Sequence, residues 1–395
     1  MTTLMRSKQR GFTLLELLIS MTVGMMLITG IIQLMANNKQ HYLFQSELAR
    51  MQENGRYALT VLRQELQMAG VSGCSANSQI TNLLDDSLAG YSDTLFSLNQ
   101  AVGGWEYSNS GAGTGPTEVY TLTSSLSSSS SLDQWHNGNA VSSDLDATLT
   151  GKVLKGTDVL VVKRTEPPLD LAYTSAQTIL TTSTNFPISG FLDANDGSND
   201  AGRLVVISDC SAADLFRNCS AVVGQVNRNT AGCPGTVPSN KASLSLGHVY
   251  RVLEGNEDAT ISAVSINSYY IGLGQDNAPT LYRKDYSNGA PLNAVPLVEG
   301  VESMQVLYGI DTDDDAVPNR YVTAQILNAI GTSGSAYADT VVSVRISLLL
   351  RSIEEVEEVV NTDSLLMAEA TINSGSDRYL RKTVSTTVQL RNGGI

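Results

Sequence analysis

The chain has few of the residue types that build common catalytic sites. It contains 3 histidines in 395 residues, His41, His136 and His248, and none lies in a His-Glu-x-x-His or Cys-His arrangement. This argues against a zinc or cysteine hydrolase. A P-loop and a Gly-x-Ser-x-Gly nucleophile elbow are also missing. We therefore expect a protein that is not an enzyme and holds no cofactor, with one calcium candidate considered below.

Basic residues are scarce as well. With 25 Lys and Arg against 39 Asp and Glu, the formal net charge is -14, and nucleic-acid binding needs clustered cations instead. No nucleic-acid partner is expected. The bases that do occur are unevenly placed, because Arg6, Lys8 and Arg10 precede the first apolar run and no acid precedes Glu16.

The cysteines are few and widely spaced. Cys74, Cys210, Cys219 and Cys233 form no Cys-x-x-Cys pair, so neither a zinc knuckle nor a redox motif is indicated. An even count suits disulfides in an oxidising compartment. The short spacings make Cys210 with Cys219, or Cys219 with Cys233, easy to join, and buried reduced thiols remain the alternative.

Proline is absent between residues 12 and 73, which permits one long helix. Residues 12–36 are about 25 residues long with a single charge, enough to cross roughly 30 Å of hydrocarbon. A cleaved secretory signal has a shorter apolar core and a small-x-small site, whereas Leu34 occupies the position where a small residue is needed before Ala36. The basic flank predicts a cytoplasmic N-terminus, with the rest of the chain across the inner membrane.

Residues 37–73 continue the helix as its amphipathic half. Apolar residues recur there at helical spacings on one face: Leu48, Met51, Ala58, Val61, Leu62, Leu66 and Ala69. The helix is expected to end near Gly70 or Gly73. The internal glycines Gly24, Gly30 and Gly55 are either close-packing points or simply tolerated.

The rest of the sequence, residues 74–395, predicts a head with two regions. Residues 74–150 are rich in Ser and Gly, with SSLSSSSSL at 124–132, and are expected to be loop. Trp105 and Trp135 in this region mark either an exposed contact surface or loop packed on the head.

Residues 151–395 are expected to form a β-rich globular head. Short β-branched runs bounded by turn residues predict strands there: 158–163, 203–208, 261–273, 280–286, 301–308, 341–350 and 383–390. The fold class is therefore α+β, a long N-terminal helix packed on a mainly antiparallel sheet with loop insertions.

One acidic turn has the spacing of a metal loop. Asp311, Asp313 and Asp315 place carboxylates at alternate positions, as at the start of an EF-hand calcium loop. However, Ala316 stands where that loop has Gly, and Val322 stands where it has the bidentate Glu. A solvated turn is favoured over a calcium site.

Glu16 is an anomaly, because an acid inside an apolar spanning helix usually has a partner. Cleavage between Gly11 and Phe12 would create an amine one helical turn away. The run from Arg10 to Ile19, RGFTLLELLI, resembles the class III signal of type IV pilins and pseudopilins. The resemblance implies that residues 1–11 are a leader, that a prepilin peptidase cuts after Gly11 and methylates Phe12, and that Glu16 aligns subunits during assembly.

Segments of the head resemble PilW-like minor pilins: 55–74, 204–216, 298–313, 341–352 and 381–392. The Ser-rich stretch and the region around Cys219 and Cys233 depart from that pattern as local insertions. The resemblance thus favours pairing Cys74 with Cys210 and Cys219 with Cys233.

The resemblance implies a minor pilin that primes or joins the pilus. Its expected partners are other minor pilins, the major pilin, the prepilin peptidase and the inner-membrane assembly platform. The precursor is expected in the inner membrane with its head in the periplasm, and the mature subunit in the surface pilus. Two alternatives are a pilus-associated adhesin, which contacts a surface through its polar loops, and a type II secretion pseudopilin, which shares the leader and helix.

Overall fold

The computed structural model describes residues 12–70, 80–88, 90–108, 119–121, 126–129, 131–137, 145–192, 201–209, 211–229, 233, 238–252, 258–288, 293–313, 315–331, 341–368 and 370–391. The predicted leader at residues 1–11, including Gly11, and both Cys74 and Cys210 lie outside these ranges.

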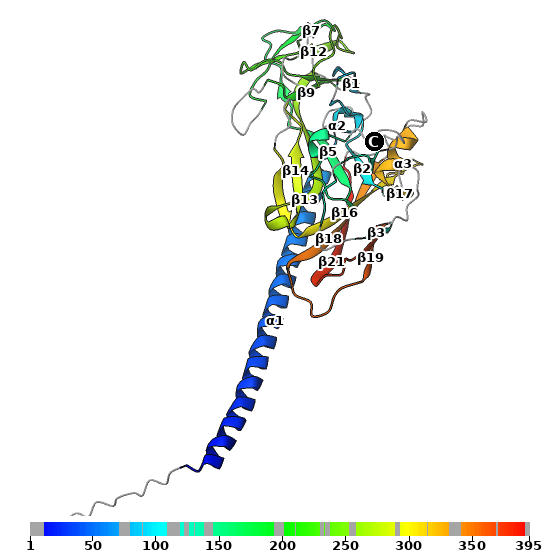
Figure 1. Ribbon diagram of the computed structural model, residues 1–395. Helices are drawn as coiled ribbons and strands as arrows, with labels where there is room; N and C mark the ends of the chain where they lie inside the picture. Colours follow the sequence, from blue (N-terminus) through cyan, green and yellow to red (C-terminus); the bar gives the residue numbers. More distant parts are fainter. Residues whose placement is uncertain are drawn as a thin grey trace, which may run out of the picture.

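The N-terminal segment folds as one continuous helix, α1 (Leu14–Gln67), of 54 residues, or about 81 Å at 1.5 Å per residue. Thr13 caps its start, since its Oγ1 accepts a hydrogen bond from the Glu16 backbone N at 3.3 Å. The helix ends three residues before Gly70, which has a φ of 110° that glycine adopts without strain. Figure 1 shows α1 projecting from the head over much of its length.

The largest sheet has ten strands within the described ranges, in the order β1-β10-β9-β13-β5-β2-β4, with β14 and β6 also on β13 and β15 on β14. Its pairs are antiparallel except for β1 with β10. The strands are β1 (Ile80–Asn82), β2 (Val102–Tyr107), β4 (Trp135–His136), β5 (Val159–Thr165), β6 (Leu169–Asp170), β9 (Leu204–Ser208), β10 (Ala213–Arg217), β13 (Thr260–Leu273), β14 (Pro279–Asp285) and β15 (Val295–Glu299).

A second, antiparallel sheet of four described strands has the order β17-β16-β18-β21. We call it the docking sheet; it consists of β16 (Val301–Ile310), β17 (Arg320–Val322), β18 (Val341–Glu355) and β21 (Tyr379–Gln389). Every strand predicted between residues 151 and 395 is present, in β5, β9, β13, β14, β16, β18 and β21. The prediction of a long helix on a mainly antiparallel head is therefore confirmed.

Smaller elements complete the head. There are three small sheets within the described ranges. The first consists of β19 (Ser364–Met367), β20 (Ala370–Asn373) and β3 (Val119–Thr121). The second pairs β8 (Asn185–Pro187) with β11 (Gln225–Asn227), and the third pairs β7 (Gln177–Ile179) with β12 (Tyr250–Val252). The short helices are α2 (Asp93–Phe96), α3 (Ala324–Gly331), η1 (Ala147–Leu149) and η2 (Gln275–Asn277).

The C-terminal half of α1 lies in the core of the head. Its buried apolar side chains share one cluster, the docking core, with one face of β18, with β16, and with β5, β13 and β14 of the large sheet. Members from the helix and β18 are Met51, Ala58, Leu62, Leu66, Val341, Val344, Ile346, Leu348 and Leu350. The predicted apolar stripe of the helix therefore packs on one face of the strand that was predicted at residues 341–350.

A distal core lies away from the helix. It contains Phe186, Phe216, Val226, Tyr250 and Ile261 among others, and it is built mainly from residues 169–192, 205–207, 244–252 and 259–263. In Figure 1 its strands β7 and β12 lie at the end of the head opposite to the projecting helix. We call this part the distal lobe, residues 169–252.

The structure differs from the loop expected at residues 74–150. Strand β2 in this region pairs with β5, and Trp105 and Trp135 are buried at 1% and 0% exposure. The Trp135 Nε1 donates to the Thr157 carbonyl at 2.9 Å. The two tryptophans are thus packed into the head, which was the second of the two alternatives.

Candidate functional site

The projecting half of α1 exposes an almost wholly apolar surface. None of its most apolar stretch is buried in the head. Within the described residues this is the one helix long and apolar enough to span a membrane. Because a core helix would be mostly buried, the segment is suited to a membrane or to other apolar helices.

Hydroxyl groups in this half are satisfied within the helix. Ser20 Oγ donates to the Glu16 carbonyl at 2.7 Å, Thr22 Oγ1 to the Ile19 carbonyl at 2.9 Å, and Thr29 Oγ1 to the Met25 carbonyl at 2.8 Å. A donor without a partner is costly in hydrocarbon. These three polar residues are therefore compatible with an apolar environment.

Phe12 and Glu16 lie at the free tip of the helix. Phe12 is 83% exposed, and Glu16 is exposed in the first turn, where a negative charge is favoured by the helix dipole. Both remain accessible to a partner, whereas Gly11 lies outside the described residues. The predicted roles of these three residues in cleavage, methylation and alignment stay predictions.

The C-terminal half of α1, which packs in the head and which we call the docked half, meets β18 at a glycine. A Cβ atom built on Gly55 would lie 2.4 Å from Leu350 Cδ1, but nothing lies within 4 Å of one built on Gly24 or Gly30. Gly55 is therefore a close-packing point, as one of the two alternatives predicted. Among the residues that the structure describes, none packs against Gly24 or Gly30.

Two polar side chains of α1 hold strand backbones in the head. Glu47, which is 9% exposed, accepts from the Ile353 backbone N through Oε2 at 2.8 Å. Asn54 Nδ2 donates to the Glu299 carbonyl at 3.0 Å at the end of β15. A third contact joins Arg50 to the Glu299 carboxylate at 3.3 Å, but it is half exposed and contributes little.

A buried ion cluster closes the N-terminal end of β21. Arg381 donates to both carboxylate oxygens of Asp377, at 2.6 and 2.7 Å, and to both of Glu302, at 2.7 and 3.1 Å. Burial is the largest single effect and would raise the pKa of Asp377, but the hydrogen bonds and charge of Arg381, the backbone hydrogen bond from Tyr379 and the charge of Arg351 together lower the pKa. The charge of Arg381 is therefore neutralised inside the head, by Asp377 and Glu302.

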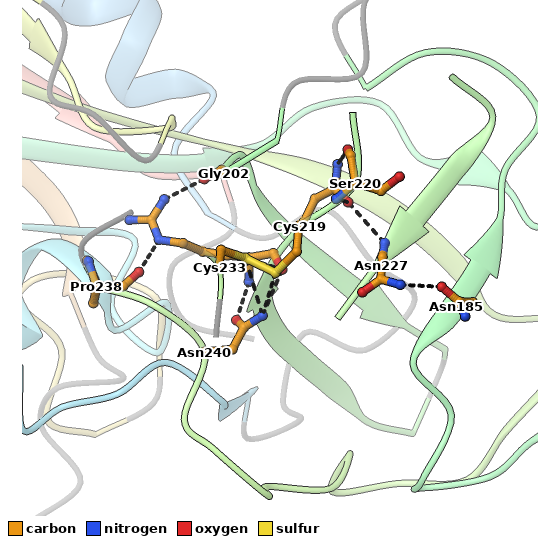
Figure 2. The surroundings of a disulfide bond; sticks show 10 residues. Asn185, Gly202, Cys219, Ser220, Asn227, Cys233, Pro238 and Asn240 are labelled. Carbon is orange, nitrogen blue, oxygen red and sulfur yellow. Dashed lines mark hydrogen bonds between the residues drawn. A yellow bond between two sulfur atoms is a disulfide. The ribbon is translucent and has the colours of Figure 1, made fainter. Parts of the chain in front are cut away.

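Cys219 and Cys233 form a disulfide with a Cα–Cα separation of 5.2 Å, as the resemblance implied. Figure 2 shows the bond beside Asn240, whose Nδ2 donates to the Arg217 carbonyl at 2.9 Å and whose Oδ1 accepts from the Arg217 N at 2.7 Å. The Arg217 side chain in turn donates to the carbonyls of Gly202 and Pro238. The disulfide and these hydrogen bonds therefore hold Cys233, Pro238 and Asn240 close to the end of β10. The other predicted pair, Cys74 and Cys210, lies outside the described residues.

The acidic turn brings Asp311, Asp313 and Asp315 together, with one carboxylate oxygen of each within 4.8 Å of the others. Hydrogen bonds inside the turn already use these groups. Asp311 accepts from the backbone N of Asp313 at 3.0 Å and of Ala316 at 2.7 Å. Ala316 adopts a φ of 62°, so the chain makes the sharp turn without the glycine. The preference for a solvated turn over a calcium site stays a prediction.

A Ser, a His and an Asp also meet in the distal lobe. The His248 Nε2 lies 3.2 Å from Ser211 Oγ and 3.3 Å from Asp209 Oδ2. Both neighbours use the same ring nitrogen, whereas a catalytic triad places the base and the orienting acid on different nitrogens. This trio is therefore a polar surface cluster at the turn between β9 and β10.

Sequence reasoning missed the polar anchors Glu47 and Asn54. Glu47 was not in the predicted apolar stripe, but it lies four positions before Met51 and therefore on the same helical face, and this spacing was the available signal. An acid at a buried helical position needs a donor, which the helix itself does not supply. The identity of that donor, the Ile353 backbone, depends on a contact across 306 positions of sequence.

Comparison with known families matches both ends of the chain. Residues 6–32 match the prokaryotic N-terminal methylation motif, and residues 268–392 match the family described as type IV pilus-assembly protein W, PilW. The second match covers the docking sheet. No curated protein and no solved structure matches the chain. The methylation signal, the apolar helix and the matched docking sheet together support a type IV pilin-like protein of the PilW family.

Proposed function

We propose that this protein is a minor type IV pilin that takes part in pilus assembly with other minor pilins and the major pilin. The observation that carries the proposal is the division of α1. One half projects unburied and apolar, and the other is fixed to the head, to β18 by Gly55 and Glu47 and to β15 by Asn54. Such a helix can leave a bilayer for the apolar interior of a fibre while its head stays folded.

In this proposal the precursor sits in the inner membrane with its head in the periplasm. A prepilin peptidase cuts between Gly11 and Phe12 and methylates the new amine, the assembly platform moves the subunit into the fibre, and Glu16 pairs with the amine of Phe12 in its own or a neighbouring subunit. The role is structural, without catalysis or a required cofactor.

The test is mass spectrometry of the N-terminal peptide in sheared surface fibres and in membranes. We expect a methylated Phe12 terminus in the fibres, at low abundance relative to the major subunit. A Met1 terminus confined to membranes would contradict the proposal. Loss of protein secretion on deletion, with surface pili intact, would assign the protein to a type II secretion system instead.

The Glu16 carboxylate is tested separately. Glu16→Ala should be cleaved normally but enter fibres poorly, whereas Glu53→Ala, an exposed acid in the docked half, should enter them as the wild type does. Equal incorporation of both variants would remove the pairing of Glu16 with the amine from the mechanism.

A further inference from the structure

Strand β21 is the long open edge of the docking sheet. It pairs with β18 over residues 381–389, and no described strand pairs with its other side. The remaining edge strands within the described ranges are two to five residues long, whereas β21 has 11 residues. A long edge presents a row of backbone donors and acceptors to a further strand.

The register identifies which backbone groups face outward. The Leu390 N donates to the Val342 carbonyl, so Leu390 and, by alternation, the even-numbered residues of β21 bond to β18. The odd-numbered residues Thr383, Ser385, Thr387 and Gln389 therefore aim their backbone N–H and C=O groups away from the sheet. All four residues are exposed.

Strand β15, an edge of the large sheet, is blocked against the addition of a further strand, in contrast to β21. Strand β15 contains Pro296, which has no N–H to donate. Its last carbonyl, that of Glu299, is occupied by the Asn54 side chain. Strand β21 contains no proline, and the one side-chain hydrogen bond recorded at its outward residues reaches the Thr387 hydroxyl, from Arg345.

The charged residues along β21 indicate what kind of strand would pair with its open edge. Residues 380–391 contain three bases and no acid, in a chain of net charge -14. Arg381 is neutralised by Asp377 and Glu302, but Lys382 and Arg391 are exposed near the two ends of β21. A second copy of β21 would set these like charges side by side, whereas an acidic strand would complement them.

We propose that β21 is a strand-addition site that accepts an extended, acidic segment of a neighbouring pilus subunit as an additional strand of the docking sheet. The backbone groups at Thr383, Ser385 and Thr387 supply the hydrogen bonds, and Lys382 and Arg391 favour acidic side chains. The site rests on the assembly role proposed above and adds to it a contact made by the head instead of the helix.

The first test removes one outward N–H. Ser385→Pro deletes a donor that β18 does not use, and edge strands tolerate proline, while Ser385→Ala removes only the hydroxyl. In sheared fibres we expect roughly tenfold less of the Ser385→Pro variant and wild-type amounts of Ser385→Ala. The thermal unfolding of the purified full-length variants in detergent should match the wild type.

Wild-type incorporation of folded Ser385→Pro would overturn the proposal. If the wild type itself is absent from fibres, the assembly role fails before the variants are compared, so the two failures are distinct.

A second test does not depend on the proline variant folding. A benzoylphenylalanine photo-crosslinker is placed at Thr383, with the exposed Val222 of the distal lobe as the control position. In cells we expect Thr383 to crosslink to an acidic stretch of another pilus subunit, and Val222 not to reach that stretch. A crosslink from Thr383 to a second copy of this chain, to a segment without acids or to no protein would overturn the proposal.

Discussion

Gly55 on α1 lies directly against Leu350 on β18, so closely that a Cβ atom at position 55 would stand 2.4 Å from Leu350 Cδ1. Leu350 is fully buried and cannot swing into solvent. The distance between helix and sheet is therefore set by the missing side chain at this position.

Gly55→Ile should destabilise the head by overpacking this contact. We expect a loss of about 1 to 3 kcal/mol in the free energy of unfolding, measured by denaturant titration of the full-length protein in detergent. Gly24→Ile is the matched control, because nothing lies within 4 Å of that position. An equal effect of both substitutions would mean that the helix contact with Leu350 is not what matters.

Glu47→Ala should also weaken the docked helix. It leaves the backbone N–H of Ile353 without its acceptor, at a cost of about 1 to 3 kcal/mol. Glu47→Gln keeps an acceptor oxygen and should lose less. Thermal unfolding of the two variants separates them, and an equal loss would show that the carboxylate charge, not the hydrogen bond, stabilises the contact.

Removing the disulfide should loosen the distal lobe and its backbone contacts with Leu83 and Asp85, but not the packing of α1. Cys219 and Cys233 are separated by 14 positions, and a loop of that size corresponds to about 3 kcal/mol. In the Cys219→Ser, Cys233→Ser double variant, hydrogen exchange should accelerate at the Lys241 amide, which donates to the Leu83 carbonyl, and at the Asp85 amide, which donates to the Ser239 carbonyl.

The Ile353 amide, bound by Glu47 at the helix, serves as the internal control for that experiment. Its exchange rate should not change. Faster exchange at Ile353 would show that the two parts of the head unfold together.

Lys163 should make stability depend on alkaline pH. Its Nζ donates to the carbonyls of Thr94 and Ser97 at 3.0 and 2.5 Å. Burial lowers its pKa to about 7, against a smaller opposite effect of Asp93. Because the unfolded chain has a lysine pKa near 10.4, it binds more protons than the folded chain between these values.

Stability should therefore rise from pH 7 towards pH 9.5, by at most about 1.4 kcal/mol per pH unit from this residue. Lys163→Met should remove that slope although it also loses two hydrogen bonds. Lys155→Met, at an exposed lysine, should retain the slope. Urea titrations across this pH range measure it, and a slope that persists in Lys163→Met would assign it to other groups.

Calcium should have no effect on the acidic turn at residues 311–315. Asp311 already accepts two backbone hydrogen bonds, and Asp313 Oδ1 accepts one from Asn319 Nδ2 at 3.1 Å. Millimolar CaCl2 covers the affinity range of extracellular calcium modules. We expect an unchanged Tm at this concentration. A rise in Tm that Asp313→Asn abolishes would establish a calcium site instead.

Three of the four described strands of the docking sheet, β16, β18 and β21, were predictable because they are long and β-branched, whereas the three-residue β17 was not predicted. The run from Val341 to Leu350 alternates apolar residues with Ser343, Arg345 and Ser347, and a strand with one apolar face needs a partner such as the helix stripe. The continuous helix was predictable for the same kind of reason, from its periodicity and its lack of proline.

Strand β2 was not predictable from its composition. Its sequence VGGWEY contains two glycines, which weaken a strand signal. The structure supplies the reason for one of them, since a Cβ atom on Gly104 would lie 2.1 Å from the Val159 carbonyl oxygen. The close approach of β2 to β5 therefore requires glycine at a place where the sequence predicts loop.

The polar sites were less accessible to sequence reasoning. The spacing of Asp311, Asp313 and Asp315 showed that they would share one turn, because such a contact is local. The hydrogen bond of Glu47 to Ile353 and the open edge of β21 depend on how distant segments are arranged, and neither leaves a pattern in the chain.

The distal lobe has its own apolar core and its own disulfide, and it lies outside the two segments that match known families. The helix is held elsewhere, by Gly55, Glu47 and the docking sheet. Substitutions in the distal lobe should therefore have little effect on how α1 packs against the docking sheet. The surface at the far end of the head is free to diversify, by substitution or by insertion, while the subunit keeps the same attachment to its fibre.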